Sequence, residues 1–150
     1  MTIEAPLSRY KKQNLLIITI VLFGAGLWFA YDAYKNLDFI AKHTIDGQPD
    51  DTLIWNKRLA PTCIIGSFLT IGYFFAVKGK KVIADDDKFT IGNTAIPYGA
   101  IEKIDKTHFD KKGFFKITYT ENGQSKELTL KDRTYDNLPA VLDHIVSKIS

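Results

Sequence analysis

Two long apolar runs, followed by a stretch in which apolar and polar residues alternate, organise this chain. Residues 59–77 read LAPTCIIGSFLTIGYFFAV and contain no Asp, Glu, Lys, Arg or His. As a helix this run spans roughly 28 Å, close to the hydrocarbon thickness of a bilayer. Residues 15–30 also lack charge, and their ten Leu, Ile, Val and Phe residues favour insertion by roughly 3 to 6 kcal/mol. The pattern predicts two transmembrane helices, at residues 14–34 and 59–77.

A cleaved signal peptide is the alternative interpretation of the first run, because Arg9, Lys11 and Lys12 precede it. The run is longer than the apolar core of a usual signal peptide. Trp28 and Asp32 lie where a small-x-small cleavage pattern would be expected. The sequence therefore favours a retained helix.

The orientation follows from the cations beside each run. Three basic residues precede the first run and three follow the second, whereas the four in residues 31–58 are diluted by five aspartates. The positive-inside rule then predicts a cytoplasmic tail at residues 1–13, a non-cytoplasmic connecting segment at 35–58 and a cytoplasmic domain at 80–150. Lys57 and Arg58 argue mildly for the opposite orientation. The predicted location is a bacterial inner membrane, with both termini cytoplasmic.

Aromatic and basic residues at the ends of the runs are the expected interface anchors. They are Trp28, Tyr31, Tyr34, Trp55, Lys78, Lys80 and Lys81. Small residues at intervals of about four predict a helix-packing seam, either within one chain or between chains. The seam residues are Gly24 and Gly26 on the first helix, and Gly66, Thr70, Gly72 and Ala76 on the second.

The connecting segment carries apolar residues at helical spacing from Tyr34 to Ile45, so we expect the first helix to continue until Gly47 and Pro49 break it. His43 lies near several aspartates, but a solvated acidic loop is far commoner than a metal site. No metal site is predicted.

After Val82 the hydrophobic period becomes two, which is typical of strands. Asp85-Asp86-Asp87, Gly92-Asn93, Gly113 and Asn122-Gly123 mark the turns. A closing helix carries one apolar stripe formed by Leu138, Val141, Leu142, Ile145 and Ile149. The predicted fold is therefore a membrane α-helical hairpin joined to a small α+β domain, an antiparallel meander of about five strands capped by a C-terminal helix.

The order of these elements, with Ile96-Pro97-Tyr98 followed by Ile101 and Ile104, resembles the pleckstrin-homology-like (PH-like) domain of small two-pass bacterial membrane proteins. The resemblance covers about residues 80–150. It implies binding or scaffolding at a membrane rather than catalysis. The family usually has more strands than the sequence shows after Val77, so the resemblance also implies either a truncated copy or a first strand merged with the end of the membrane helix.

Net charge, cysteine content and the motifs present limit the classes of function that the sequence supports. The net charge of +3 comes from 20 basic and 17 acidic residues, which is too balanced to indicate nucleic-acid binding. Cys63, the single cysteine, lies in the second apolar run and is expected to pack there. Phosphate-binding loops, zinc-protease motifs and nucleophile elbows do not occur in the sequence. An enzyme is therefore only a remote third alternative, and no cofactor is expected.

The candidate contact site is a run of cations in the soluble domain, interleaved with acidic residues. It comprises Lys103, Lys106, Lys111, Lys112 and Lys116. The main hypothesis is a non-catalytic interaction or scaffolding module that holds another membrane protein or a second copy of itself, such as a small subunit of a membrane complex. The alternative is a sensor of anionic lipid headgroups, in which these lysines bind phosphate.

Overall fold

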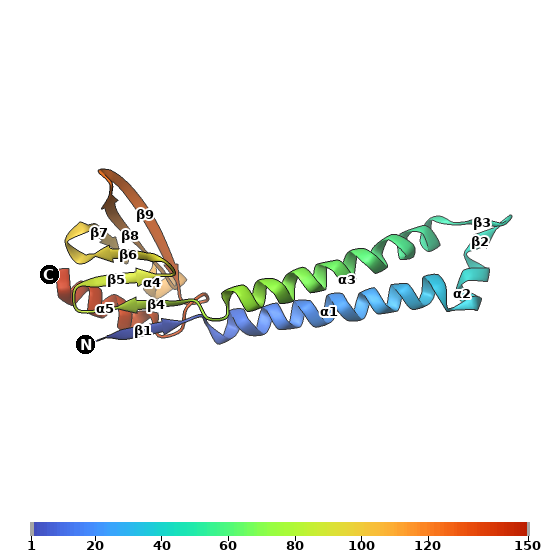
Figure 1. The fold of residues 1–150 in the computed structure, drawn as a ribbon, viewed down its shortest axis with the longest axis horizontal. Helices are drawn as coiled ribbons and strands as arrows, with labels where there is room; N and C mark the ends of the chain where they lie inside the picture. Colours follow the sequence, from blue (N-terminus) through green and yellow to red (C-terminus); the bar gives the residue numbers. More distant parts are fainter. Residues whose placement is uncertain (1, 150) are drawn as a thin grey trace. The chain divides into compact units, whose positions relative to one another are not determined.

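The computed structural model describes residues 2–149 and divides into two compact units (Figure 1). Unit 1 contains the chain up to Lys12 and everything from Val77 onward, and unit 2 contains Gln13–Ala76. The first unit is therefore discontinuous in sequence. The apolar segments form a 64-residue insertion between its two parts, counted from 13 to 76.

Unit 2 is a helical hairpin. Helix α1 covers Arg9–Tyr34 and helix α3 covers Asp51–Val77. The first four residues of α1 and the last residue of α3 belong to unit 1. Both are long and apolar enough to span a membrane. Each helix begins before the predicted span, directly after a residue whose side chain caps it, Ser8 for α1 and Asp50 for α3.

The connection between the two long helices has a local structure of its own. Helix α2 (Leu37–Lys42) begins after Asn36, whose side chain accepts a hydrogen bond from the backbone N–H of Phe39. Strands β2 (Thr44–Ile45) and β3 (Gln48–Pro49) then form a minimal hairpin. The first helix does not continue through this segment, because the Asn36 cap starts a new helix after Tyr34.

Unit 1 contains two antiparallel sheets. The first has the order β1-β4-β5-β6, and the second has the order β7-β8-β9. Their bounds are β1 Ile3–Pro6, β4 Lys81–Ala84, β5 Lys88–Ile91, β6 Thr94–Pro97, β7 Ile101–Asp105, β8 Phe114–Glu121 and β9 Gln124–Lys131. A short 3₁₀ turn η1 (Tyr98–Ala100), helix α4 (Phe109–Lys112) and the closing helix α5 (Leu138–Ile149) complete the unit. The antiparallel pairing agrees with the prediction, but the single five-stranded meander does not.

Two strands account for this difference. Strand β1 comes from the segment before α1 and pairs with β4, so that Ile3 lies opposite Ala84 and Pro6 opposite Lys81. Strand β6 was not recognised in the sequence, because it ends at Pro97 and a turn follows directly. Strand β7 ends at Asp105, because Thr107 donates its backbone N–H to the Asp105 carboxylate and the chain turns into α4.

The predicted turns are present. Asn122 and Gly123 have φ of 51° and 75°, which matches the two-residue hairpin turn between β8 and β9. Gly113 has φ of 67° and caps α4 in the left-handed conformation.

One hydrophobic core lies between the two sheets and α5. The buried residues alternate along the strands, as in Phe115, Ile117 and Tyr119 of β8. The helix contributes the predicted stripe except at its end, where Ile149 is 38% exposed. The core residues are Ala5, Val82, Ala84, Phe89, Ile96, Tyr98, Phe115, Ile117, Tyr119, Leu130, Leu138, Val141, Leu142 and Ile145.

Candidate functional site

The surface of the helical hairpin is mostly apolar and exposed. In the most apolar windows of α1 and α3, only 6% and 17% of the residues are buried. A core helix of a water-soluble protein would bury most of such a window. The large exposed side chains include Ile17, Ile20, Val21 and Leu27 on α1, and Ile65, Phe68, Leu69 and Phe75 on α3. This surface is suited to lipid rather than to water.

The predicted seam residues have different surroundings. Gly26 is buried, and a Cβ added there would lie 2.7 Å from Cγ1 of Ile64 and 3.2 Å from the backbone oxygen of Ala60. Gly66 lies beside Leu22, at 3.6 Å from an added Cβ to its Cδ1. Thr70 donates to the backbone oxygen of Gly66, whereas Ala76 is exposed and added Cβ atoms at Gly24 and Gly72 would meet nothing within 4 Å. Close approach of the two helices is therefore concentrated at Gly26.

The predicted interface anchors are all exposed, and the aromatic ones are more than half exposed. Among the lysines, Lys81 forms an ion pair with Glu4 at 2.6 Å. This ion pair joins neighbouring strands β1 and β4, so Lys81 also has a role within the sheet.

The acidic connecting segment is organised by Asp50. Its Oδ1 accepts the backbone N–H of Leu53 and so caps α3, while its Oδ2 lies 2.7 Å from Nδ1 of His43. The hydrogen bond from Leu53, and then that with His43, lower the pKa of Asp50. Within residues 2–149, no group of three or more His, Cys, Asp or Glu side chains is placed to hold a metal ion.

The segment before α1 is fixed to unit 1 by a dense set of backbone contacts. Leu7 donates its N–H to the oxygen of Lys80 at 3.0 Å, and Ser8 donates its N–H to the oxygen of Thr134 at 2.8 Å. The Ser8 hydroxyl bonds to the oxygen of Arg133 and also accepts the N–H of Lys11 at 3.1 Å, capping α1. Ser8 is only 1% exposed. The sequence could not predict these contacts with Lys80, Arg133 and Thr134, because more than 70 residues separate these partners from Leu7 and Ser8.

The predicted lysine cluster does not form one free cationic site. Lys116 is paired with Glu127 at 2.8 Å, and this ion pair raises its pKa. Lys103 lies on the same sheet, where β7 pairs with β8. Lys106 lines a cleft of about 630 Å³ together with Phe109 of α4 and Leu142 of α5. The remaining two, Lys111 and Lys112, are exposed in the last turn of α4.

Strand β9 is an edge strand over its full length of eight residues. It pairs with β8, and no further strand pairs with its outer side among residues 2–149. Glu121 and Gln124 close the two-residue turn as a hydrogen-bonded pair, and hydrogen-bonded and non-hydrogen-bonded pairs alternate from there along the strand. Residues 125, 127 and 129 therefore point their backbone N–H and C=O groups away from β8. Most side chains of this strand are exposed. The strand therefore offers an open row of backbone donors and acceptors.

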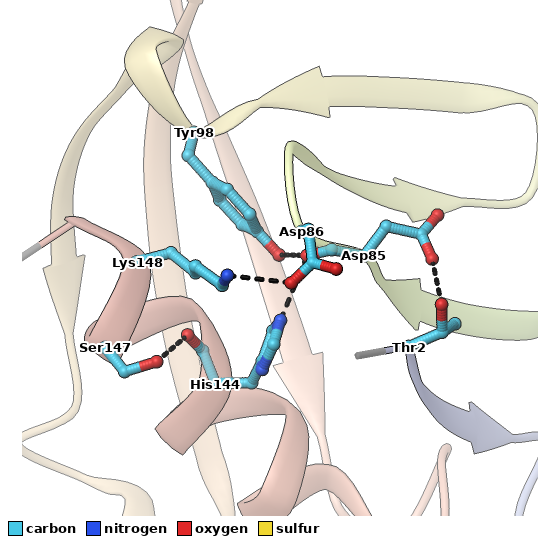
Figure 2. A network of polar contacts seen from close by, with 7 residues as sticks. All are labelled: Thr2, Asp85, Asp86, Tyr98, His144, Ser147 and Lys148. Atoms are coloured by element: carbon cyan, nitrogen blue, oxygen red, sulfur yellow. Dashed lines mark hydrogen bonds and ion pairs between the residues drawn. The ribbon is translucent and has the colours of Figure 1, made fainter.

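A polar network joins the Asp85 turn to α5 (Figure 2). The backbone oxygen of Asp85 accepts the Tyr98 hydroxyl at 2.6 Å and lies 3.0 Å from Nε2 of His144, while Lys148 pairs with Asp86 at 2.8 Å. Burial, and then the neighbouring carboxylates, raise the pKa of Tyr98 to about 12. Pairing with Lys148 lowers the pKa of Asp86. These contacts hold the turn after β4 against α5.

No protein-family model, no curated protein and no solved structure matches this chain.

Proposed function

We propose that this chain is a two-pass integral membrane protein of a bacterial inner membrane, with both termini cytoplasmic and unit 1 acting as a non-catalytic interaction or scaffolding module. The observation that carries the membrane assignment is the exposed apolar surface of α1 and α3, which are almost unburied over their most apolar windows. In water this surface would be strongly unfavourable, at about 25 cal/mol per Å² of apolar area.

The orientation is supported by how the chain is threaded. Unit 1 includes both the residues before α1 and those after α3, and β1 pairs with β4. Two crossings return the chain to the side on which it began, so this pairing is compatible with two spans and incompatible with one. The cations that flank the helices within unit 1 favour the cytoplasmic side. Processing after α1 would remove β1, which supports retention of the first helix.

The PH-like assignment is supported by the strand arrangement. Four strands and three strands form two antiparallel sheets that enclose one core with a C-terminal helix. The strand that the segment after Val77 lacks is supplied by β1. The unit is therefore proposed to be a PH-like module whose first strand lies ahead of the membrane hairpin.

Topology can be tested with single cysteines in a Cys63→Ser background. Leu37 is exposed in the connection, and Gly99 is exposed in unit 1. We expect a membrane-impermeant thiol reagent to label Leu37→Cys in intact cells and to label Gly99→Cys only after the cells are broken. The parent protein should also remain in the pellet after alkaline carbonate extraction, and its release into the supernatant would refute membrane insertion.

The edge of β9 is the proposed partner surface, where an extended segment of another membrane protein would add a strand. The backbone N–H of Thr129 points away from β8, so Thr129→Pro removes this N–H without removing a bond to β8. Proline is tolerated at such edge positions. A photo-crosslinking residue at Gln124, which is exposed, reports contacts in native membranes. We expect a discrete adduct that is lost in Thr129→Pro and kept in Thr129→Ala. An adduct unaffected by the proline would rule out strand addition at this edge.

The second candidate function is an anionic-lipid sensor, and exposed Lys111 and Lys112 in the last turn of α4 favour it. Each lysine near an anionic surface contributes about 1 kcal/mol. In the parent protein, a lack of preference for anionic over zwitterionic bilayers would exclude this candidate.

A further inference from the structure

The loop between β9 and α5 lies against the start of α1, although more than 120 residues separate them in sequence. Both the N–H and the hydroxyl of Ser8 donate to this loop, to the backbone oxygens of Thr134 and Arg133. Leu7 forms an isolated antiparallel bridge with Tyr135. Leu7 also donates to Lys80, so three distant segments meet where the chain enters α1 and leaves α3.

Four basic residues lie on these neighbouring backbone segments, namely Arg9, Lys80, Lys131 and Arg133, which we name the junction cluster. All four are exposed, and within residues 2–149 none of them forms an ion pair. Two carboxylates belong to the same loop region, and that of Asp136 already accepts the backbone N–H of Arg9 at 3.0 Å. Four cations outnumber the two carboxylates, so the net charge of this region is positive. The four cations are available to an external anion.

We propose that the junction cluster binds the phosphate groups of anionic phospholipids, with Lys131 and Arg133 acting as a third membrane-contacting element beside the ends of the two helices. Arg9 is the first residue of α1, and Lys80 follows the last residue of α3 by three positions. The apolar run begins six positions after Arg9 along the helix, or about 9 Å. Cations at this depth lie among headgroups when α1 and α3 are in the membrane. The inference therefore rests on the proposed membrane insertion.

The chemistry favours a lipid phosphate over other anions. Arginine binds phosphate through two parallel N–H donors, and lysine supplies a compact charge. The overall charge balance of the chain does not favour nucleic acid. The Ser8 hydroxyl bonds to the backbone oxygen of Arg133 and caps α1, so Arg133 lies beside the start of this helix although it belongs to neither flanking segment of the hairpin.

The test uses the full chain reconstituted in mixed bilayers that contain spin-labelled phosphatidylglycerol or spin-labelled phosphatidylcholine. The measured quantity is the ratio of the protein's association constants for the two lipids. The test variant is Lys131→Gln/Arg133→Gln, and the matched control is Lys103→Gln/Lys106→Gln, which removes the same charge from cations outside the junction cluster. Both variants leave the backbone bonds of Ser8 in place.

We expect the parent to prefer phosphatidylglycerol, and the test variant to lose at least about fivefold of this preference at low salt, while the control changes it less than twofold. The preference of the parent should also fall steeply as salt is raised. Equal effects of the two variants would overturn the inference, as would displacement of the labelled lipid by inorganic phosphate at constant ionic strength. If the parent fails to enter bilayers at all, the proposed membrane insertion itself fails, which is a separately recognisable outcome.

Discussion

Replacing Leu7 with Ala measures how much the segment before the membrane hairpin contributes to unit 1. Leu7 is 3% exposed, and its backbone bonds to Lys80. Truncating a buried leucine to alanine costs about 2 to 5 kcal/mol. We take the lower end, because Leu7 directly follows β1, an edge strand where neighbouring groups can relax. A loss of about 2 kcal/mol corresponds to about a 30-fold increase in the population of opened molecules.

The assay is amide hydrogen exchange, followed by mass spectrometry, of the full chain in lipid nanodiscs. We expect exchange in β4 and α5, both of which adjoin β1, to accelerate by about 30-fold. The control is Leu37→Ala, because Leu37 is 77% exposed and lies outside unit 1. If exchange in β4 and α5 were the same in both variants, the segment before α1 would not be an integral strand of the unit.

Three further predictions concern single positions, each measured by unfolding of the reconstituted protein. Gly26→Ala should destabilise the helical hairpin by about 1 to 3 kcal/mol, because the added methyl meets the backbone of α3, whereas Gly24→Ala has open space and should be neutral or stabilising. The pKa of Tyr98 is near 10 in the unfolded chain and about 12 in the folded chain, so the unfolded chain loses the proton first as the pH rises. The free energy of unfolding should therefore fall by about 2 to 3 kcal/mol between pH 10 and pH 12, and Tyr98→Phe should lack this part of the decline. Gly123→Ala forces a side chain into φ of 75° and should cost about 1 to 2 kcal/mol, whereas Gly99→Ala, which has no positive φ, should cost less; equal costs would contradict the turn geometry.

Local patterns in the sequence were sufficient to predict the elements that depend on local interactions. Uncharged runs identified α1 and α3, and a 3.6-residue stripe identified α5. Asn-Gly identified the β8–β9 turn, because few residues adopt two successive positive φ angles.

Features that depend on distant contacts could not be predicted in this way. Strand β1 has four residues, of which one is charged and one is proline, so its own pattern is too weak to indicate a strand. Only its pairing with β4 defines it. The same limitation affected the candidate site, since the sequence could not show that Lys116 is neutralised by Glu127 or that Arg133 lies beside Ser8.

The discontinuity of unit 1 sets the order in which the protein can fold during synthesis. Strand β1 leaves the ribosome about 75 residues before β4, and at 5 to 20 residues per second it waits roughly 4 to 15 s for its partner. Throughout this wait its backbone is unpaired, and a longer, more apolar strand would be prone to aggregate. The glutamate and proline that weaken β1 as a strand thus protect the nascent chain until both helices have been made and the sheet can close.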